Sequence, residues 1–282
     1  MFDSVIIVVQ FPKIKSNDGN ISFNADYKNW VPKGMIYGLG AATAGLSGAA
    51  VVVRHHFKGK LSTVGSAILG SGALGSGAVT AWCVYAHNQF SYDGKRKLSK
   101  AIIDGITEYV SLPENGVGLD VGCGSGALTI ACAKRNPHGR MVGIDRWGAE
   151  YASYSQKLCE RNAQAEGVTN VSFQNGDACR LNFADESFDV VTSNYVYHNI
   201  AGKNKQELLK ETLRVLKKGG TFAIHDIMEP VRYGDMEKFV EELKAEGYED
   251  IHLVPTADGL FMSKLESRVM MLHGSTLLVG RK

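Results

Sequence analysis

Residues 118–126 read GLDVGCGSG, and this glycine-rich stretch decides the fold of the chain. The apolar residues that lead up to Val121 predict a strand, and the apolar residues 127–133 that follow predict a helix. Glycines on a sharp turn from strand to helix let a ligand approach the backbone closely, and the start of a helix offers unpaired N–H groups. The stretch therefore predicts a ligand site at this turn.

A second short apolar strand ends in Asp145. A carboxylate at the tip of the second strand suits a ribose, which needs both of its hydroxyls bonded. The glycine turn and this acid together predict a nucleoside cofactor. The spacing Gly122-x-Gly124-x-x-Ala127 is compatible with a dinucleotide such as NAD. The position of Asp120 favours a different cofactor, because a carboxylate there would attract an ammonium group and repel a pyrophosphate.

The same residues also read Asp120-x-Gly122-x-Gly124-x-Gly126, and this spacing resembles the first motif of class I S-adenosylmethionine (SAM) methyltransferases. SAM carries an ammonium group that Asp120 could hold, directly or through water. Further segments resemble motifs of the same family in the family's order: 176–178, 183–191, 214–220 and 274–281. The resemblance extends over residues 90–282 and implies that the cofactor is SAM.

The resemblance also implies which residues would bind SAM. In the family, the acid after the third strand, here Asp177, usually bonds the adenine amino group. Aromatic residues at the position of Tyr92 fold over the cofactor in similar enzymes, although residues 90–95 could equally form a plain linker. The predicted cofactor-binding residues are Asp120, Gly122, Gly124, Gly126, Asp145, Arg146, Asp177, Ala178, Asn194 and Tyr92.

Strands and helices are predicted to alternate through this region. Strands are expected near Val117, Val142, Val171, Val190, Phe222, Ile251 and Leu277. Helices are expected at residues 97–110, 126–135, 149–166, 203–216 and 236–246. This alternation predicts an α/β fold with a doubly wound, mostly parallel seven-stranded sheet, and the resemblance implies that its last strand is antiparallel. Ligands bind beyond the carboxyl ends of such strands, where Asp120, Asp145, Asp177 and Asn194 fall.

Two side chains at the same rim are candidate catalytic residues. His198 follows the fourth strand, in a loop that passes beside the transferred methyl group in relatives. Its imidazole could take a proton from an acceptor hydroxyl, amine or thiol, or it could be a structural cap on the following helix. Asp226 ends the fifth strand and is the second candidate, with a helix cap as its alternative role.

The composition limits the classes of protein and partner. The chain has 282 residues, of which 44% are hydrophobic and 21% charged, enough for one sizeable α/β domain and an appendage. A formal net charge of +2 gives no electrostatic case for binding nucleic acid. The five cysteines have no metal-ligand spacing, so no metal is expected, and their odd number favours free thiols in a reducing compartment.

The N-terminal third has a different composition. Residues 34–53 and 61–86 carry no charged side chain, and about twenty apolar residues suffice to span a bilayer as a helix. Trp30 precedes the first run and Trp82 lies near the end of the second, as is typical of membrane interfaces. The runs predict a two-helix membrane hairpin, with a soluble helical hairpin as the alternative. Their many small residues could also pair copies of the hairpin into a homo-oligomer.

The distribution of positive charge predicts the orientation of the hairpin. Eight lysines and arginines flank the two runs and three lie between them, which favours both termini on the cytoplasmic side. We therefore expect a membrane protein with its catalytic domain in the cytoplasm. The predicted domains are an N-terminal interfacial segment (1–33), the membrane hairpin (34–89) and a methyltransferase domain (90–282).

These observations predict a membrane-anchored SAM-dependent methyltransferase whose acceptor is an apolar or lipid-associated small molecule. The resemblance is to small-molecule methyltransferases of ubiquinone and menaquinone biosynthesis, although the hairpin departs from their soluble members. Quinone precursors, phospholipid head groups and hydrophobic thiols or phenols all fit, so an O-, N-, S- or C-acceptor is left open. A different class of function is a SAM-binding membrane scaffold or sensor without turnover, because SAM-binding acids alone do not require turnover.

Overall fold

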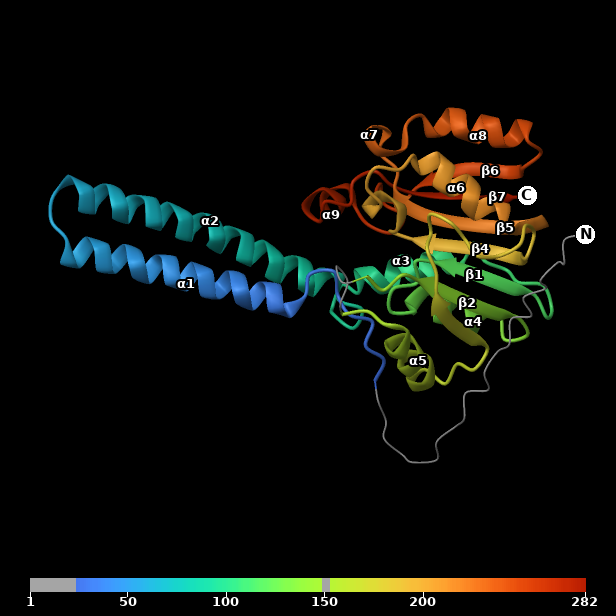
Figure 1. The fold of residues 1–282 in the computed structure, drawn as a ribbon, viewed down its shortest axis with the longest axis horizontal. Helices are drawn as coiled ribbons and strands as arrows, with labels where there is room; N and C mark the ends of the chain where they lie inside the picture. Colours follow the sequence, from blue (N-terminus) through green and yellow to red (C-terminus); the bar gives the residue numbers. More distant parts are fainter. Residues whose placement is uncertain (1–23, 149–152) are drawn as a thin grey trace, which may run out of the picture. The chain divides into compact units, whose positions relative to one another are not determined.

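The computed structural model describes residues 24–148 and 153–282 (Figure 1). Tertiary contacts divide the described chain into two compact units, one formed by Lys28–Lys100 and the other by the remaining described residues. Most of the predicted interfacial segment, and the start of the helix predicted at 149–166, lie outside the described residues.

The larger unit is built on a seven-stranded sheet with the strand order β3-β2-β1-β4-β5-β7-β6. The strands are β1 (Val117–Val121), β2 (Arg140–Asp145), β3 (Val171–Asn175), β4 (Phe188–Asn194), β5 (Leu216–Ile227), β6 (Glu249–Pro255) and β7 (Ser275–Arg281). Strands β1 to β5 pair in parallel, whereas β7 runs antiparallel to both β5 and β6. The predicted mostly parallel sheet with an antiparallel last strand is confirmed.

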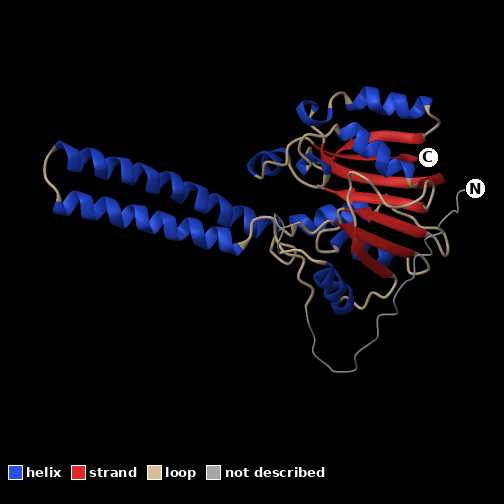
Figure 2. Ribbon diagram, in the orientation of Figure 1, coloured by secondary structure: helices blue, strands red, loops and turns tan. Residues whose placement is uncertain are grey.

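Helices cover both faces of this sheet (Figure 2). They are α3 (Leu98–Thr107), α4 (Ala127–Arg135), α5 (Gln156–Ala165), α6 (Lys205–Arg214), α7 (Pro230–Tyr233), α8 (Met236–Ala245) and α9 (Lys264–Val269), with a 3₁₀ turn, η2 (Tyr197–Asn199). Four starts carry side-chain caps, because Ser155, Asn204, Asp235 and Ser263 accept hydrogen bonds from backbone N–H groups of α5, α6, α8 and α9. The capped start of α5 lies later than the sequence predicted.

The strand register brings the chemistry-bearing residues to one rim of the sheet. Val121 pairs with Ser193, so Gly122 and Asn194 leave the sheet at the same level. Asn194 in turn pairs with His225, one residue before Asp226. The carboxyl ends of β1, β4 and β5 therefore meet at this rim, as expected for parallel strands in a doubly wound sheet.

The smaller unit contains two long helices, α1 (Lys33–His56) and α2 (Lys60–Phe90), which enclose the two predicted uncharged runs. The helices pack along each other, and the hydroxyl of Thr43 donates to that of Ser76 across the pair at 2.9 Å. A methyl group built on Gly72 would lie 3.6 Å from Leu46 Cδ1, an ordinary packing distance. At one end of this pair, the Trp30 ring meets that of Trp82 edge-on at 5.9 Å.

Candidate functional site

The glycine-rich loop connects β1 to α4 as the sequence predicts. Its three motif glycines, Gly122, Gly124 and Gly126, all have positive φ angles, of 73°, 55° and 85°. Residues that have a side chain rarely adopt this backbone conformation, which explains why glycine occupies these positions. A Cβ on Gly122 would lie 2.3 Å from Val196 Cγ2, whereas one on Gly124 would meet no atom within 4 Å. The loop therefore leaves open space beside Gly124.

Asp145, at the tip of β2, holds this loop. Its Oδ2 accepts a hydrogen bond from the backbone N–H of Gly124 at 2.9 Å, and Oδ1 accepts one from the N–H of Trp147 at 2.7 Å. The indole N–H of Trp147 donates back to the Gly124 carbonyl at 2.9 Å. Each carboxylate oxygen keeps a second lone pair, and Asp145 is half-buried, so the group can still accept hydroxyl hydrogen bonds.

Asp120 lies one layer deeper, inside the sheet. Its side chain is buried, and its two oxygens accept hydrogen bonds from the hydroxyls of Thr129 at 2.6 Å and Thr192 at 3.1 Å. Burial raises the pKa of this carboxyl to about 7, although the two threonine hydrogen bonds act in the opposite direction. Sequence reasoning missed both threonines, which lie nine and 72 residues from Asp120.

A short segment near the N-terminus also contacts the glycine loop. The hydroxyl of Ser125 donates to the Tyr27 carbonyl at 2.8 Å. The amide of Asn162, on α5, donates to the carbonyls of both Ser125 and Asp26 and accepts a hydrogen bond from the Asp26 N–H. Asn162 is buried with three hydrogen bonds, so it fixes one side of the loop. No sequence motif marks these residues.

The other predicted cofactor residues are dispersed around this centre. Asp177 is exposed after β3, and its Oδ1 accepts from the Cys179 N–H at 2.8 Å. Ala178 is half-buried against the main hydrophobic core, and the Arg146 carbonyl accepts from the Asn175 amide at 3.1 Å. Tyr92 belongs to the smaller unit, where Lys100 Nζ lies 5.8 Å from its ring centre. Its contact with a cofactor stays a prediction.

His198 and Asp226, the predicted catalytic residues, contact each other directly. Nδ1 of His198 is hydrogen-bonded to Oδ1 of Asp226. The other oxygen of Asp226 accepts the backbone N–H groups of Tyr197 and His198, at 2.7 and 3.2 Å. Burial would raise the pKa of the Asp226 carboxyl, but the hydrogen bond and charge of His198 hold it below its ordinary value. The His198 side chain stays 14% exposed, whereas the Asp226 side chain is fully buried.

A second polar network underlies this rim. His225 is buried, with Nδ1 2.8 Å from Asn194 Oδ1 and Nε2 2.7 Å from the Thr256 hydroxyl. Burial lowers the pKa of His225 to about 3, so the ring is neutral at physiological pH. Tyr195, at φ 55°, bonds the Ser275 hydroxyl at 2.8 Å. These contacts fix Asn194, a predicted cofactor residue, by its amide oxygen.

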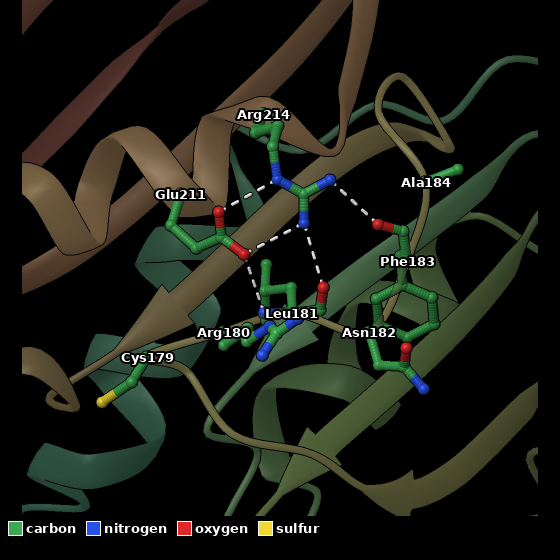
Figure 3. A pocket seen from close by; sticks show the side chains of 8 residues that line it. All are labelled: Cys179, Arg180, Leu181, Asn182, Phe183, Ala184, Glu211 and Arg214. Carbon is green, nitrogen blue, oxygen red and sulfur yellow. Dashed lines mark hydrogen bonds and ion pairs between the residues drawn. The ribbon is translucent and has the colours of Figure 1, made fainter.

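A surface cavity of about 820 Å³ lies between the loop after β3 and α6 (Figure 3). Figure 3 shows the guanidinium of Arg214 at its wall, paired with Glu211. Arg214 also donates to the carbonyls of Leu181 and Phe183 and to the carboxylate of Asp185. Every guanidinium nitrogen of Arg214 donates a hydrogen bond, so this side chain stabilises the loop after β3. None of the residues that line the cavity is a predicted site residue.

The donor groups at this rim bear on the kind of ligand that it can hold. Among residues 24–148 and 153–282, no group of three or more His, Cys, Asp or Glu side chains is arranged to hold a metal. The open space beside Gly124, the available lone pairs of Asp145 and the buried carboxylate of Asp120 match a ligand with a ribose and an ammonium group.

Comparison with known proteins identifies relatives of this chain. A family model described as a methyltransferase domain matches residues 113–261. A demethylmenaquinone methyltransferase of Lactobacillus johnsonii is 35% identical over 113 residues, 40% of this chain and 44% of that protein. A 2-phytyl-1,4-naphtoquinone methyltransferase of Thermosynechococcus vestitus is 31% identical over 124 residues, 44% of this chain and 51% of that protein. The chain thus spans about half the length of these curated relatives.

Solved structures show the same fold. Phosphoethanolamine N-methyltransferase 2 of Haemonchus contortus, in complex with SAM, superposes with a TM-score of 0.51 at 18% identity, covering 71% of this chain and 56% of that one. The family model covers just over half of the 282 residues, including β1 to β6 and the glycine loop. On this evidence the chain belongs to the methyltransferase domain family, and its larger unit has the fold of class I SAM-dependent methyltransferases.

Proposed function

We propose that the chain transfers the methyl group of SAM to a reduced quinone ring, or to a similar apolar phenol, that is dissolved in a membrane. The observation that carries this proposal is the pairing of His198 with Asp226 at the same rim as the glycine loop. A histidine whose Nδ1 is held by a buried carboxylate presents Nε2 as a proton acceptor.

The residues of the loop would bind and orient the cofactor. Asp145 would accept the ribose hydroxyls, and Asp120 would attract the ammonium group. The backbone at Gly122, Gly124 and Gly126 would allow close approach, while Asp177 and Ala178 would contact the adenine. Arg146, Asn194 and Tyr92 complete the proposed set.

His198 and Asp226 would handle the acceptor. Bound SAM supplies a methyl group on a positively charged sulfonium. Nε2 of His198 would take the proton of an acceptor hydroxyl, and Asp226 would stabilise the imidazolium that results. The electron pair left on oxygen would make an adjacent ring carbon nucleophilic. That carbon would form the bond to the methyl group while the methyl–sulfur bond breaks, its electron pair staying on sulfur so that S-adenosylhomocysteine leaves. The ring then loses its own hydrogen as a proton to solvent.

The names of the relatives support a quinone-type ring as the acceptor. One of the curated relatives described above is named a demethylmenaquinone methyltransferase and the other a 2-phytyl-1,4-naphtoquinone methyltransferase. The similarity is confined to about half of each of those proteins, so the substrate of this chain is part of the proposal. Long apolar tails on such rings would keep the acceptor in a bilayer, which agrees with a membrane-bound enzyme.

The hairpin would anchor the enzyme in the bilayer. Both helices are long and apolar enough to cross a membrane. No residue of α1 is buried, so it does not resemble the core helix of a soluble protein. Tyr37, Ile68 and Leu74 are exposed, which is costly in water and favourable in lipid. Residues 33–90 contain no Asp or Glu. The cations Arg54, Lys58 and Lys60 lie in or next to the turn that joins the two helices. The prediction that the methyltransferase unit is cytoplasmic follows from the charge distribution alone.

Substitution of His198 tests the proposed chemistry. His198→Ala should lower kcat by about 10²–10⁴ with little change in SAM affinity, because the imidazole touches the acceptor and not the cofactor. Asp226→Asn should keep the side-chain shape while removing the charge that orients His198.

Two other outcomes would contradict this role. Joint loss of SAM affinity and thermal stability in His198→Ala would assign the residue to structure. Tight SAM binding by the wild type, without turnover on any lipid extract, would favour the alternative function of a SAM-binding scaffold or sensor. Calorimetry with SAM, release of S-adenosylhomocysteine and melting temperature, measured on the same samples, separate these cases.

A further inference from the structure

Large apolar side chains are exposed on one rim of the methyltransferase unit. Val231, on α7, is 87% exposed, and Leu265, on α9, is 73% exposed. Leu260 and Met271 lie on the same connection between β6 and β7 as α9, and each is more than half exposed. Among the described residues of this unit, the one other large hydrophobic side chain that is exposed is that of Tyr109, at 36%. Exposure is thus concentrated on two segments.

The two segments are joined to each other. The Met228 N–H donates to the Gly274 carbonyl at 3.0 Å, and Glu229 is paired with His273 at 2.7 Å. The register agrees, because Ile227 at the end of β5 pairs with Ser275 at the start of β7. Val231 and Met271 therefore each lie two residues from a direct contact between the segments.

The same segments border the rim where His198 and Asp226 would handle the acceptor. A guanidinium nitrogen of Arg232 lies 3.4 Å from the His198 carbonyl, which it approaches as a donor. On the other segment, Phe261 stacks edge-on against His225 with ring centres 5.6 Å apart. The exposed apolar residues therefore lie on the outer side of the elements whose inner side forms the site.

Packing does not explain this exposure. The β6–β7 connection has apolar side chains that do face inward, since Met262, Met270 and Leu272 are buried. Leu260 and Leu265 are additional to these and remain in contact with water. Isolated exposed leucines are common, but a group of large apolar side chains at the mouth of a site indicates a binding surface.

The positive charges beside these residues favour an anionic partner. Arg232 follows Val231, and Lys264 and Arg268 flank Leu265 on α9. The carboxylates of these segments are already engaged: Glu266 accepts from the Ser263 N–H, Glu229 pairs with His273, and Asp258 pairs with Lys264. Arg268 has no carboxylate partner among the described residues. Apolar side chains next to cations are typical of surfaces that enter the headgroup layer of an anionic bilayer.

We propose that Val231, Leu260, Leu265 and Met271, here called the apolar rim, dock into the surface of a bilayer that contains anionic phospholipid. Arg232 and Arg268 would contact the phosphate groups. The inference deepens the proposed function and rests on it for the identity of the acceptor, since the rim would let a membrane-dissolved acceptor reach His198 without crossing water.

Depth measurement on the full-length protein tests the docking. In a Cys179→Ser background, the other four cysteines are buried, so a single new cysteine can carry an environment-sensitive fluorophore. Leu265→Cys and Val231→Cys report on the rim, and Lys238→Cys on α8, whose side chain is 74% exposed, is the control. Ile68→Cys on α2 reports on the hairpin. The protein is reconstituted in phosphatidylglycerol–phosphatidylcholine vesicles with doxyl-labelled lipid as the quencher.

The proposal expects blue-shifted, quenched emission at positions 265 and 231 and aqueous emission at position 238. Quenching at position 68 without quenching at 265 would overturn the rim and leave the membrane hairpin intact. Quenching at 265 without quenching at 68 would support the rim and contradict the hairpin. A blue shift at 265 that depends on protein concentration without lipid would assign the rim to a second copy of the chain, which also overturns the proposal.

A functional measurement separates docking from chemistry. The double variant Val231→Ser/Leu265→Ser should lose about tenfold in turnover on acceptor presented in vesicles, because two apolar side chains no longer partition into lipid. Its turnover on acceptor dissolved in detergent micelles, its SAM affinity and its melting temperature should match the wild type. Equal turnover of variant and wild type on vesicles would contradict the docking role. Absence of turnover in both proteins, with rim quenching retained, would refute the proposed reaction alone.

Discussion

Asp120 holds its carboxylate inside the sheet, where burial raises the pKa of the group to about 7. Near neutral pH this carboxyl is therefore divided between its protonated and ionised forms. A cation bound nearby favours the ionised form, so binding of the SAM ammonium would release a proton. The proposed contact with Asp120 thus has a consequence that depends on pH.

We predict that SAM affinity rises with pH through this range. The dissociation constant should fall by roughly three- to tenfold from pH 6 to pH 8, because the carboxyl of free Asp120 is protonated at the lower value. Asp120→Asn should bind SAM more weakly and lose this dependence. Calorimetry at several pH values provides the measurement. A flat profile in the wild type would mean that Asp120 does not sense the ammonium.

Some residues of the candidate site could be predicted from the sequence and others could not. The positions of Asp145 and His198 at strand ends could be predicted, because parallel strands bring their carboxyl ends together whatever the rest of the sequence. Thr192 and Asn162 were missed, because their contacts join residues that lie 72 and 37 positions apart in the chain. Such partners depend on packing and leave no local pattern.

The glycine loop is constrained by its backbone conformation and by the space beside it, and substitutions can separate these two constraints. Gly122 and Gly124 both have positive φ, so alanine is strained at either position. A Cβ on Gly122 would collide with Val196, whereas a Cβ on Gly124 would point into open space. Under the proposed function, the cofactor would approach the loop at the second position.

Gly124→Ala should therefore fold with a modest loss of stability, of about 1 kcal/mol, and bind SAM at least about tenfold more weakly. Gly122→Ala is the matched variant, and it should lower the melting temperature much further because Val196 must move. Thermal unfolding and SAM titration of both proteins provide the data. Undiminished SAM binding by Gly124→Ala would show that the cofactor does not approach this part of the loop.

Regular elements were predicted more accurately than irregular ones. The strands and long helices of the methyltransferase unit follow apolar periodicity, and all were found in order. The short elements η2, α7 and α9 were missed, because three to six residues do not establish a helical period. The left-handed Tyr195 between β4 and η2 was missed for a similar reason, since tertiary contacts such as its hydrogen bond to Ser275 hold it there.

At the scale of the molecule, the chain combines a methyltransferase unit with a two-helix unit that lacks acidic residues between positions 33 and 90. Helix α1 rises about 30 Å between Lys33 and Arg54, at about 1.5 Å per residue, which matches the hydrocarbon core of a bilayer. The cations near its ends would then lie at the two interfaces. This is the physical basis for expecting a membrane protein.

We predict that the intact chain stays in the membrane pellet after alkaline carbonate extraction. Val51 and Ile68 are exposed on the helices, so Val51→Asp/Ile68→Asp should release the protein, because an aspartate within the bilayer is costly, by about 2.5–3.5 kcal/mol at the centre of a helix and less toward its ends. Phe57→Asp is the matched control, since Phe57 is equally exposed but lies in the turn between the helices. Release of the unmodified chain by carbonate would favour the soluble hairpin.

Transfer of labelled methyl groups is the most direct test that the chain methylates an apolar small molecule with SAM. The full-length protein would be incubated with SAM labelled in its methyl group and with native membranes treated with a reductant to keep quinones reduced. We predict that label enters an apolar small molecule in the organic extract, with an equal amount of S-adenosylhomocysteine released, and that His198→Ala reduces both by about 10²–10⁴. Tight binding of SAM with neither labelled product nor S-adenosylhomocysteine would contradict it.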